Sequence, residues 1–590
     1  MSGHGLVSVF NKQGVASFAS FLSSRGLKLL SSSGTAHLLK EYSVSVEDIS
    51  DFTGSPEILG GRVKTLHPKI YGGILQDMQN PEHVRDMKQA NIPPLSVVVV
   101  NLYPFDKKNC IENIDIGGVT LIRAAAKNFN SVLVVVDPQD YISIMQQYDE
   151  ITSNSATGLA LRRHYAKKAF HYIAQYDISI ASYFEDETYH IKQGNMPETI
   201  YRTYQKQQDM KYGCNPHQEK AAAYAIKKPL ENSELPFIVE NGTPGYINVL
   251  DALYSWQLVM EVRNTLDLTC AASFKHNAPA GVGTSIPLSD NTMQTYDVTS
   301  KEVGTPCSMA FVRARNCDPL SSFGDFIAIN DIVDIETARL IKREVSDGII
   351  ALGYSEEALE LLKSKKNGKY IILVGKNVDK YQNKEPFEFK EVDGCAVMQS
   401  VNREKVDERY FEHCVTENKK RLPENIRDLT LANITLKYTP SNSVAAAYDG
   451  QVIGIGAGQQ NRVDCVKLVK NKVNNWYLRH HPKALQHVKK IKEMGLKRQE
   501  RVNSVMNYIS TDPEMIKEEN AFASGMGTMT DMVLASDAFF PFSDSIDVAA
   551  EMGVSHIMQT GGSVMDEKVT ETADKYGMCM FLSHIRVFTH

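Results

Sequence analysis

The sequence lacks the cysteine arrangements that mark a disulfide-rich or zinc-binding protein. Its nine cysteines include no C-x-x-C pair and no evenly spaced framework. Small secreted domains and structural zinc sites both depend on such spacing. We therefore expect reduced thiols in a cytosolic protein.

Long apolar runs and several common site motifs are also missing. No stretch approaches the roughly 20 apolar residues that a helix needs to cross a bilayer. The N-terminal residues lack a basic segment followed by a continuous apolar one, so we expect neither membrane insertion nor a secretion signal. The D-x-D-x-D-G calcium loop, the Walker P-loop and the G-x-S-x-G elbow are absent too.

Positive charge is not in excess. The formal net charge is -6 and the pI is about 6.3, which argues against binding nucleic acid through diffuse basic charge. One basic segment, residues 483–501, is interrupted by Glu493 and Glu500. We interpret it as a solvated helix rather than a nucleic-acid contact. An anionic ligand must therefore meet local groups of basic residues.

The length of 590 residues exceeds the roughly 250 to 300 residues at which single cores stop growing, so at least two domains are expected. In the first part, short β-rich apolar runs alternate with helical periodicity, which is typical of βα units. The runs are residues 6–10, 27–30, 97–100 and 132–136, with helices from about residue 15, after residue 35 and at about 159–183. These features predict a doubly wound parallel sheet that ends near residue 200.

The remaining part mixes strands and helices and is long enough for two subdomains. One hairpin is visible in it. Ser443–Tyr448 and Gln451–Ile455 are strand-like, and Asp449-Gly450 between them is a strong two-residue turn signal.

Two motifs of the first part suit a phosphate. Ser31–Thr35 lies between a strand and a helix, where free N–H groups and the helix dipole attract anions, although plain N-capping is the alternative. In Gly60–Pro68 an extended backbone would place Arg62 and Lys64 on one face. The alternative there is a solvated basic edge.

Two further motifs follow strands of the first part. Asn101–Phe105 places Tyr103 at a strand end, where open α/β sheets bind ligands, unless it is a packed loop tyrosine. The glycines of Asp115–Gly118 permit close backbone approach, and Arg123 and Lys127 follow at i, i+4. Like charges at that spacing are unfavourable unless an anion is near, although a solvated helix face is the alternative.

In the second part, Ser273–Gly281 ends a short apolar stretch at Lys275-His276 and then breaks it with Pro and Gly. Histidine is the usual acid/base group near neutral pH, and a neighbouring ammonium can stabilise developing negative charge. A lone Lys-His pair in a loop without function is the alternative.

Many motifs together resemble the bifunctional AICAR transformylase/IMP cyclohydrolase family, from about Leu6 to the C-terminus. They occur in that family's order and spacing, and they are GGRVKTLHP, NLYPF, DIGGVTLIRAAAKN, YGCNPHQ, SFKHNAPAG, SSFGDF, REVSDGII, KYTPSNSV, QVIGIGAGQQNR and SDAFFPF. Many motifs in one order are more specific than any one of them.

The resemblance implies an α/β enzyme with two activities. Residues 1–198 would form a methylglyoxal-synthase-like cyclohydrolase domain, and residues 199–590 a transformylase domain of two cytidine-deaminase-like subdomains without catalytic metal. The enzyme would transfer a formyl group from 10-formyltetrahydrofolate to AICAR, giving FAICAR, and then cyclise FAICAR to IMP with loss of water. It also implies a homodimer in the cytosol, with no nucleic-acid or membrane partner.

The family's functional residues carry over by motif. In the cyclohydrolase, Lys127 would transfer protons and Lys64, Tyr103 and Asp115 would line the reacting end. The nucleotide would be held by Lys12, Ser32, Ser33, Gly34, Thr35, Arg62, Val63, Thr65, Asn101 and Ile116.

In the transformylase, His276 would be the general base and Lys275 the transition-state stabiliser. The ribotide would be held by Lys211, Tyr212, Asn248, Gly324, Asp347, Asn442, Arg462, Phe539 and Arg586. The folate would lie near Val463, Asp544, Ser563 and Val564.

Three residues depart from the family's pattern. Phe10 stands where a small hydroxyl is common and Ser33 where glycine is common, which affects the phosphate-binding region. Lys211 replaces arginine and loses its bidentate fork. A competing hypothesis is a regulatory, phosphate-binding N-terminal domain fused to a monofunctional formyltransferase; the joint presence of Lys64, Tyr103, Asp115 and Lys127 argues against it.

Overall fold

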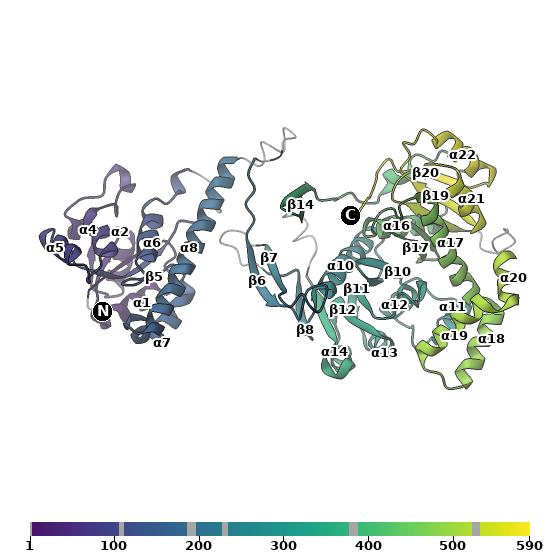
Figure 1. Ribbon diagram of the computed structural model, residues 1–590, viewed down its shortest axis with the longest axis horizontal. Coiled ribbons are helices and arrows are strands. Elements are labelled where there is room, and N and C mark those ends of the chain that lie inside the picture. Colours follow the sequence, from purple (N-terminus) through teal and green to yellow (C-terminus); the bar gives the residue numbers. More distant parts are fainter. Residues whose placement is uncertain are drawn as a thin grey trace. The chain divides into compact units, whose positions relative to one another are not determined.

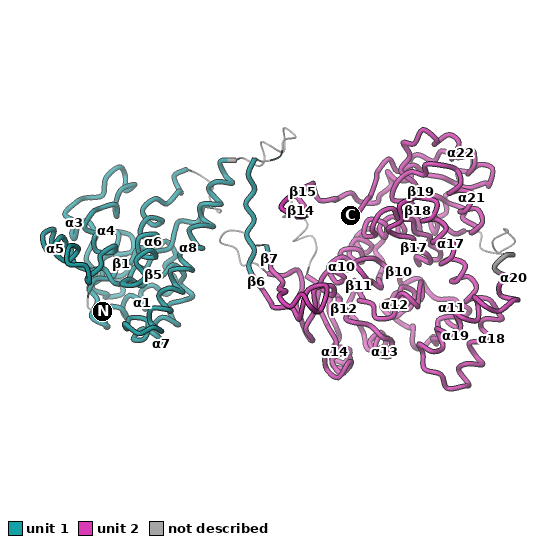
Figure 2. Tube along the Cα trace, viewed as in Figure 1, with its two compact units in different colours: residues 1–205, 226–233 teal, residues 206–225, 234–590 magenta. Residues whose placement is uncertain are grey.

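The computed structural model describes residues 3–105, 111–185, 196, 198–226, 234–376, 387–521 and 531–590. The chain forms two compact units, which Figure 2 distinguishes by colour. Unit 1 comprises Met1–Gln205 and Ile226–Ser233, and unit 2 comprises Lys206–Ala225 and Glu234–His590.

Unit 1 contains a five-stranded sheet in the order β3-β2-β1-β4-β5, and every pair in it is parallel. The strands are β1 (His4–Val9), β2 (Lys28–Ser31), β3 (Val46–Asp48), β4 (Leu95–Asn101) and β5 (Leu133–Val135). All seven residues of β4 are buried, as expected for a strand covered on both faces. The predicted doubly wound sheet is confirmed, and its order reverses between β1 and β4.

Helices cover both faces of this sheet (Figure 1). One face packs on α1 and α7, through a core that includes Phe18 and Ile144. The other face packs on α4, α6 and α8, through a core that includes Ile70, Leu121 and Ile173. The helices are α1 (Val15–Ser24), α2 (Ser33–Glu41), α3 (Ile49–Thr53), α4 (Pro68–Leu75), α5 (Pro81–Gln89), α6 (Gly117–Lys127), α7 (Tyr141–Thr152) and α8 (Ala156–Glu185).

Unit 2 is built on an eleven-stranded sheet in the order β20-β19-β18-β16-β17-β10-β9-β11-β12-β13-β8. The strands are β8 (Phe237–Asn241), β9 (Cys270–Lys275), β10 (Ala278–Thr284), β11 (Asp325–Val333), β12 (Ser346–Tyr354), β13 (Ile371–Gly375), β16 (Val444–Tyr448), β17 (Gln451–Gly456), β18 (Met532–Ser536), β19 (Val554–Gln559) and β20 (Cys579–Leu582). Two short separate sheets pair β6 (Tyr204–Asp209) with β7 (Ala222–Ile226) and β14 (Phe387–Val392) with β15 (Cys395–Ser400).

The large sheet consists of two halves with the same order of elements. Each half runs helix, antiparallel hairpin, helix, strand, helix, strand, helix, strand. The helices of the first half are α10 (Tyr246–Leu266), α12 (Pro306–Cys317), α13 (Ile335–Arg343) and α14 (Glu356–Lys363); those of the second are α16 (Pro423–Lys437), α17 (Arg462–Arg479), α21 (Asp544–Glu551) and α22 (Asp566–Lys575). Antiparallel pairing of β10 with β17 joins the halves into one sheet. The chain therefore contains an internal repeat, consistent with the two similar subdomains that the family resemblance implies.

One face of this sheet is covered across both halves by α10 and α16, whose core includes Trp256 and Leu431. On the opposite face each half has its own helices and its own core. Additional helices outside the repeat are α11 (Asp290–Thr295), α18 (Pro482–Glu493), α19 (Arg498–Thr511) and α20 (Pro513–Ala521). The basic segment 483–501 was expected to be one helix, and this is wrong: Gly495, with φ 74°, separates α18 from α19.

The sequence predictions differ in success for the two hairpins of unit 2, β16–β17 and β9–β10. The predicted one is confirmed as β16–β17, with positive φ at Asp449 and Gly450. The prediction that Pro and Gly end the stretch after Lys275-His276 is wrong, because the chain turns and continues as β10, with Pro279 opposite Phe274. The glycine at 281 is needed there because a Cβ would collide with the carbonyl of Ala314 on α12.

Among the described residues, no helix combines the length and apolar character needed to cross a membrane.

Candidate functional site

A cavity of about 650 Å³ lies at the carboxyl ends of β1 and β4. This is the position where the strand order reverses, and ligands of open α/β sheets bind at such points. Eleven of the residues expected in the cyclohydrolase site line it, namely Lys12, Ser32, Gly34, Thr35, Arg62, Lys64, Thr65, Asn101, Tyr103, Asp115 and Ile116. Phe10, one of the departures from the family pattern, lines it as well.

Asn101, at the end of β4, ties the two central strands together. Its Oδ1 accepts the peptide N–H groups of Phe10 and Asn11, each at 2.7 Å, and its Nδ2 donates to the Asn11 carbonyl at 3.2 Å. The side chain is only 7% exposed, so its role is to fix the backbone at the cavity wall.

The start of α2 and Lys12 form the most anion-compatible part of the wall. Ser32 is the N-cap of α2, and its hydroxyl lies 2.8 Å from that of Ser8. The Lys12 ammonium donates to the Val9 carbonyl and the Thr35 hydroxyl, and burial lowers the pKa of Lys12. A phosphate here would meet a helix N-terminus and an ammonium together.

The loop with Arg62 and Lys64 differs from its prediction. An extended backbone was expected, but Gly60 and Gly61 have φ 65° and 89° and Arg62 is helical. Both cations nevertheless face the cavity, because the chain folds back and pairs Ile58 with Val63.

Both of these cations already have carboxylate partners. Arg62 pairs with Glu112, and Lys64 lies 3.1 Å from Glu57. The Arg62–Glu112 pair is largely exposed and the Lys64–Glu57 pair about one-third exposed. The first pair is therefore worth little, and a phosphate can replace its carboxylate at small cost.

Asp115 lies beside the start of α6. Burial raises the pKa of its carboxyl, and the peptide N–H groups of Gly118 and Tyr103 partly oppose this. The N–H of Gly118 donates to it at 2.6 Å, and a Cβ at Gly118 would lie 2.8 Å from its Oδ2. A buried carboxyl with a raised pKa at the cavity wall is a candidate for proton transfer.

Two tyrosines of α8 support this wall and were missed in the sequence. The Tyr172 hydroxyl accepts the N–H of Leu102 at 3.0 Å, and the Tyr176 hydroxyl accepts that of Asp115 at 2.8 Å. Their i, i+4 spacing on an otherwise apolar helix face was the available signal.

Three expected residues do not line the cavity. Ser33 is exposed and its hydroxyl donates to Glu57, and Val63 pairs with Ile58. Lys127 is exposed at the last position of α6. At about 1.5 Å per residue, it lies about 15 Å along the helix from the cavity end of α6.

In unit 2, the strand directions bring the transformylase candidates to one edge of the large sheet. β9 ends there and β10 begins there, and β11 and β12 begin there too. Across the junction β17 ends, β16 begins and β18, β19 and β20 end at the same edge. We call it the site edge; the candidates next to it are Asn248, Lys275, His276, Gly324, Asp347, Asn442, Arg462, Val463, Phe539, Asp544, Ser563, Val564 and Arg586. Lys211 and Tyr212 lie in the segment between β6 and β7.

In the first half, Lys275 is the last residue of β9, and His276 and Asn277 form the turn between β9 and β10. The Lys275 ammonium donates to the Phe323 carbonyl at 2.7 Å, next to Gly324. His276 is exposed, with φ 56°, and Asp347 pairs with Lys366 at 2.8 Å. The imidazole is thus open to solvent while the lysine is anchored.

In the second half, Arg462 is buried and connects three neighbouring segments. It pairs with the buried Asp537, and donates to the Ser443 carbonyl and to Asn442 Oδ1, both at 2.9 Å. Other candidates here are accessible: Phe539 is partly exposed, and Asp544, Val564 and Arg586 are exposed.

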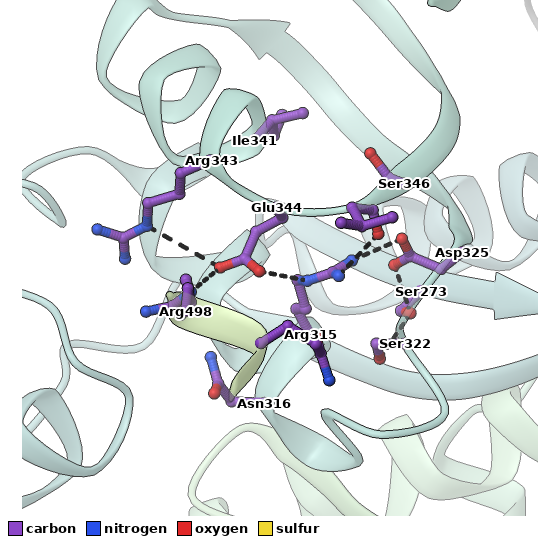
Figure 3. Close-up of polar contacts among 12 residues, drawn as sticks. Ser273, Arg315, Asn316, Ser322, Asp325, Ile341, Arg343, Glu344, Ser346 and Arg498 are labelled. Carbon is purple, nitrogen blue, oxygen red and sulfur yellow. Dashed lines mark hydrogen bonds and ion pairs between the residues drawn. The ribbon is translucent and has the colours of Figure 1, made fainter. Parts of the chain in front are cut away.

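A buried chain of charges lies behind the first-half turn (Figure 3). Ser273 of β9 donates to Asp325 at 2.6 Å, and Arg315 donates to the other carboxylate oxygen of Asp325 at 2.6 Å. Arg315 also contacts Glu344 at 3.3 Å, and Glu344 pairs with Arg498. Burial alone would raise the pKa of Glu344, but the charges of Arg498 and Arg315 lower it. This chain anchors β9 next to Lys275.

The candidates are spread widely along the site edge. Neighbouring strands lie about 4.8 Å apart, so the eight steps from β12 to β20 span roughly 38 Å. The C-terminal segment folds back along this edge, and the N–H of Val587 donates to the carbonyl of Asp537 just after β18. Arg586 therefore lies about six steps, or roughly 29 Å, from Asp347 on β12, which is still longer than a single ribotide. Among the described residues, no group of three or more His, Cys, Asp or Glu side chains is placed to hold a metal ion.

Comparisons with known proteins identify the family of the chain. The MGS-like domain model matches residues 14–128, which include most of unit 1's sheet and its cavity. The AICARFT/IMPCHase bienzyme model matches residues 125–472, more than half of the chain. A solved structure described as the crystal structure of ForH is 32% identical over 30% of this chain and 95% of its own, with a TM-score of 0.28. The chain therefore belongs to the AICARFT/IMPCHase bienzyme family and is a bifunctional enzyme of purine biosynthesis, a formyltransferase and an IMP cyclohydrolase.

Proposed function

We propose that the cavity of unit 1 cyclises FAICAR to IMP and that the site edge of unit 2 formylates AICAR with 10-formyltetrahydrofolate. The assignment of cyclisation to unit 1 rests on one observation. A single cavity gathers hydroxyls, cations and Asp115 at the point where the strand order of the sheet reverses. The start of α2 with Lys12 would take the phosphate. Tyr103 and Asp115 would lie at the heterocycle, where ring closure needs proton transfer.

An isolated fragment of residues 1–198 tests this division. The fragment contains the whole parallel sheet and its cavity, so we expect it to fold and to convert FAICAR to IMP without formylating AICAR. A folded fragment that binds FAICAR but does not cyclise it would contradict the division.

Lys127 is the cyclohydrolase assignment that the single chain supports least. The nearest α6 residue that lines the cavity is Leu121, six positions or about 9 Å earlier along the helix. A proton-transfer role therefore needs either a change in the position of this side chain or a lysine from a second chain. We still expect Lys127→Ala to slow cyclisation strongly and to leave formylation nearly intact. Arg123→Ala, on the same helix and also exposed, is the matched control. Equal cyclisation rates in the two variants would remove Lys127 from the mechanism.

For formylation, we propose that His276 removes a proton from the 5-amino group of AICAR as it attacks the formyl carbon. Lys275 would stabilise the developing oxyanion. The exposed imidazole beside an anchored ammonium supports this pairing of roles. Asn248, Gly324 and Asp347 lie beside them.

We further propose that the enzyme is a cytosolic homodimer whose transformylase sites use both chains. The support is the length of the site edge, because one ribotide cannot contact both of its ends within a chain. A head-to-head pair of such edges would bring the first half of one chain to the second half of its partner. The direct test of activity is an absorbance assay with AICAR and 10-formyltetrahydrofolate, followed by identification of FAICAR and IMP.

A further inference from the structure

The internal repeat of unit 2 places two buried aspartates in matching positions. Asp251 is the sixth residue of α10, and Asp428 is the sixth residue of α16. The peptide N–H of Asn277 donates to Asp251 Oδ1 at 2.8 Å, and that of Gly450 donates to Asp428 Oδ1 at 2.9 Å. In both halves, an aspartate from the helix therefore holds the second residue of the hairpin turn.

The two turns have similar backbones but different side chains. His276 and Asn277 have φ 56° and 60°, and Asp449 and Gly450 have φ 49° and 73°. Only the second half has glycine at the second position, where the left-handed conformation is free of strain. The first-half turn holds two side chains in that conformation, so it depends more on the hydrogen bond to its aspartate.

The two aspartates also differ in how their charge is compensated. Asp428 is 3% exposed and pairs with Arg427 at 2.8 Å, which opposes but does not cancel the rise that burial causes in the pKa of its carboxyl. Asp251 is 5% exposed and forms no ion pair within the described part of the chain. The nearest opposite charge that acts on it is that of His276, while Asp347 and Asp325 repel it.

Burial raises the pKa of the Asp251 carboxyl to about 6, against the opposing effects of the Asn277 N–H and of His276. At neutral pH the side chain is therefore a buried carboxylate without a fixed cation. Such a group reduces stability, since the folded state holds the proton more tightly than the unfolded chain does. If the turn needed only an acceptor for the Asn277 N–H, the neutral amide of an asparagine at position 251 would supply it.

We propose that Asp251 is a positioning residue for formyl transfer: it holds the Lys275–His276–Asn277 turn, and its negative charge stabilises the imidazolium that forms as His276 accepts the proton. The inference rests on the proposed role of His276. No bond to Asp251 forms or breaks. One proton passes from the 5-amino group to the imidazole, and the carboxylate stays ionised throughout, as the aspartate of a serine-protease triad does.

The first experiment compares Asp251→Asn with Asp428→Asn in the full-length enzyme. Asparagine keeps an acceptor for the turn N–H in each half and removes only the charge. We expect Asp251→Asn to lower kcat for formylation about tenfold or more with little change in the KM for AICAR. Asp428→Asn should leave kcat near the wild-type value. A wild-type kcat in Asp251→Asn, or an equal loss in both variants, would overturn the inference.

Thermal unfolding separates this role from a structural one. Asp251→Asn should unfold at the wild-type temperature or higher at pH 7.5, because it removes an uncompensated buried charge. Asp428→Asn should unfold lower, because it leaves Arg427 without its partner. If Asp251→Asn is the destabilised variant, the aspartate is structural and the inference fails.

The pH dependence gives a second readout that a structural role would not change. Below pH about 6, Asp251 takes up a proton and becomes electrically equivalent to asparagine. The ratio of wild-type to Asp251→Asn formylation rates should therefore fall toward one between pH 7.5 and 5. A ratio that stays constant over this range would contradict the inference.

A double variant distinguishes this inference from the proposed function. If His276→Ala itself formylates AICAR at near the wild-type rate, the role of His276 is wrong, and the inference falls with it. If His276→Ala is impaired, adding Asp251→Asn to it should cause little further loss, because Asp251 acts through His276. If the formylation losses of His276→Ala and Asp251→Asn are fully additive in the double variant, the inference about Asp251 is overturned and the proposed role of His276 stands.

Discussion

The two units of the chain present their candidate residues in different ways. In unit 1, one cavity inside a single parallel sheet gathers most of them. In unit 2, they lie along an edge of roughly 38 Å, anchored from behind by buried ion pairs such as Arg315–Asp325. The comparison indicates that a compact sheet gathers most of its candidate residues around one cavity within a single chain. A long repeated sheet spreads its candidates too far apart for one ribotide, which is why we propose a site shared between two chains.

The largest expected effect is a loss of formylation in unit 2 while cyclisation in unit 1 is kept. His276→Ala and Lys275→Ala should each reduce formylation by about 10²-fold to 10⁴-fold, since both a positioned base and an oxyanion donor contribute on this scale. AICAR binding should change little. Both variants should still convert supplied FAICAR to IMP in unit 1, which controls for the amount of active enzyme, while unchanged AICAR binding controls for the folding of unit 2. A variant that formylates at near the wild-type rate would remove that residue from the mechanism.

The next effect concerns stability. Arg315 is buried against Asp325 and Glu344, so Arg315→Ala leaves carboxylates without their cation. We expect a loss of about 3 to 5 kcal/mol in the free energy of unfolding of unit 2. The matched control is Arg25→Ala in the exposed Arg25–Asp149 pair of unit 1, which should cost less than about 1 kcal/mol. Differential scanning calorimetry of the full chain should show only the unit 2 transition shifted by Arg315→Ala. Equal shifts from both variants would show that unit 2 does not depend on its buried charges.

The smallest effect concerns the rim of the unit 1 cavity. The Phe10 and Tyr103 rings lie 5.2 Å apart and are each about half exposed. A ligand heterocycle that contacts them would gain about 1 kcal/mol, the usual worth of an aromatic pair. Phe10→Ser should therefore weaken IMP binding several-fold without changing the formylation rate. Unchanged IMP affinity, measured by calorimetric titration, would mean that Phe10 does not touch the ligand.

The parallel sheet of unit 1 could be predicted from the sequence because its strands are uninterrupted apolar runs, as in Val97–Val100. The approximate place of the phosphate-binding helix start was equally visible, since Ser31–Thr35 follows a strand directly. The loop at Gly60–Arg62 could not be predicted, because two glycines with positive φ reverse a segment that otherwise alternates like a strand.

Other features depend on contacts between distant segments. Asp251 has no local signal, because its partner Asn277 is 26 residues away along the chain. Continuity of β9 into β10 was hidden by Pro279 and Gly281, which normally interrupt strands. The internal repeat shows no visible sequence periodicity; the family resemblance implies two similar subdomains, and the matched order of helices and strands defines their bounds.

We propose above that each transformylase site combines the first half of one chain with the second half of another. Mixing His276→Ala chains with Arg586→Ala chains is the decisive experiment, since both side chains are exposed and their loss should not disturb the fold. After subunit exchange of equal amounts, half of the dimers are hybrids, and one of the two sites in each hybrid has both residues intact. We expect recovery of about a quarter of wild-type formylation. No recovery, with subunit exchange demonstrated independently, would show that each site is built within one chain.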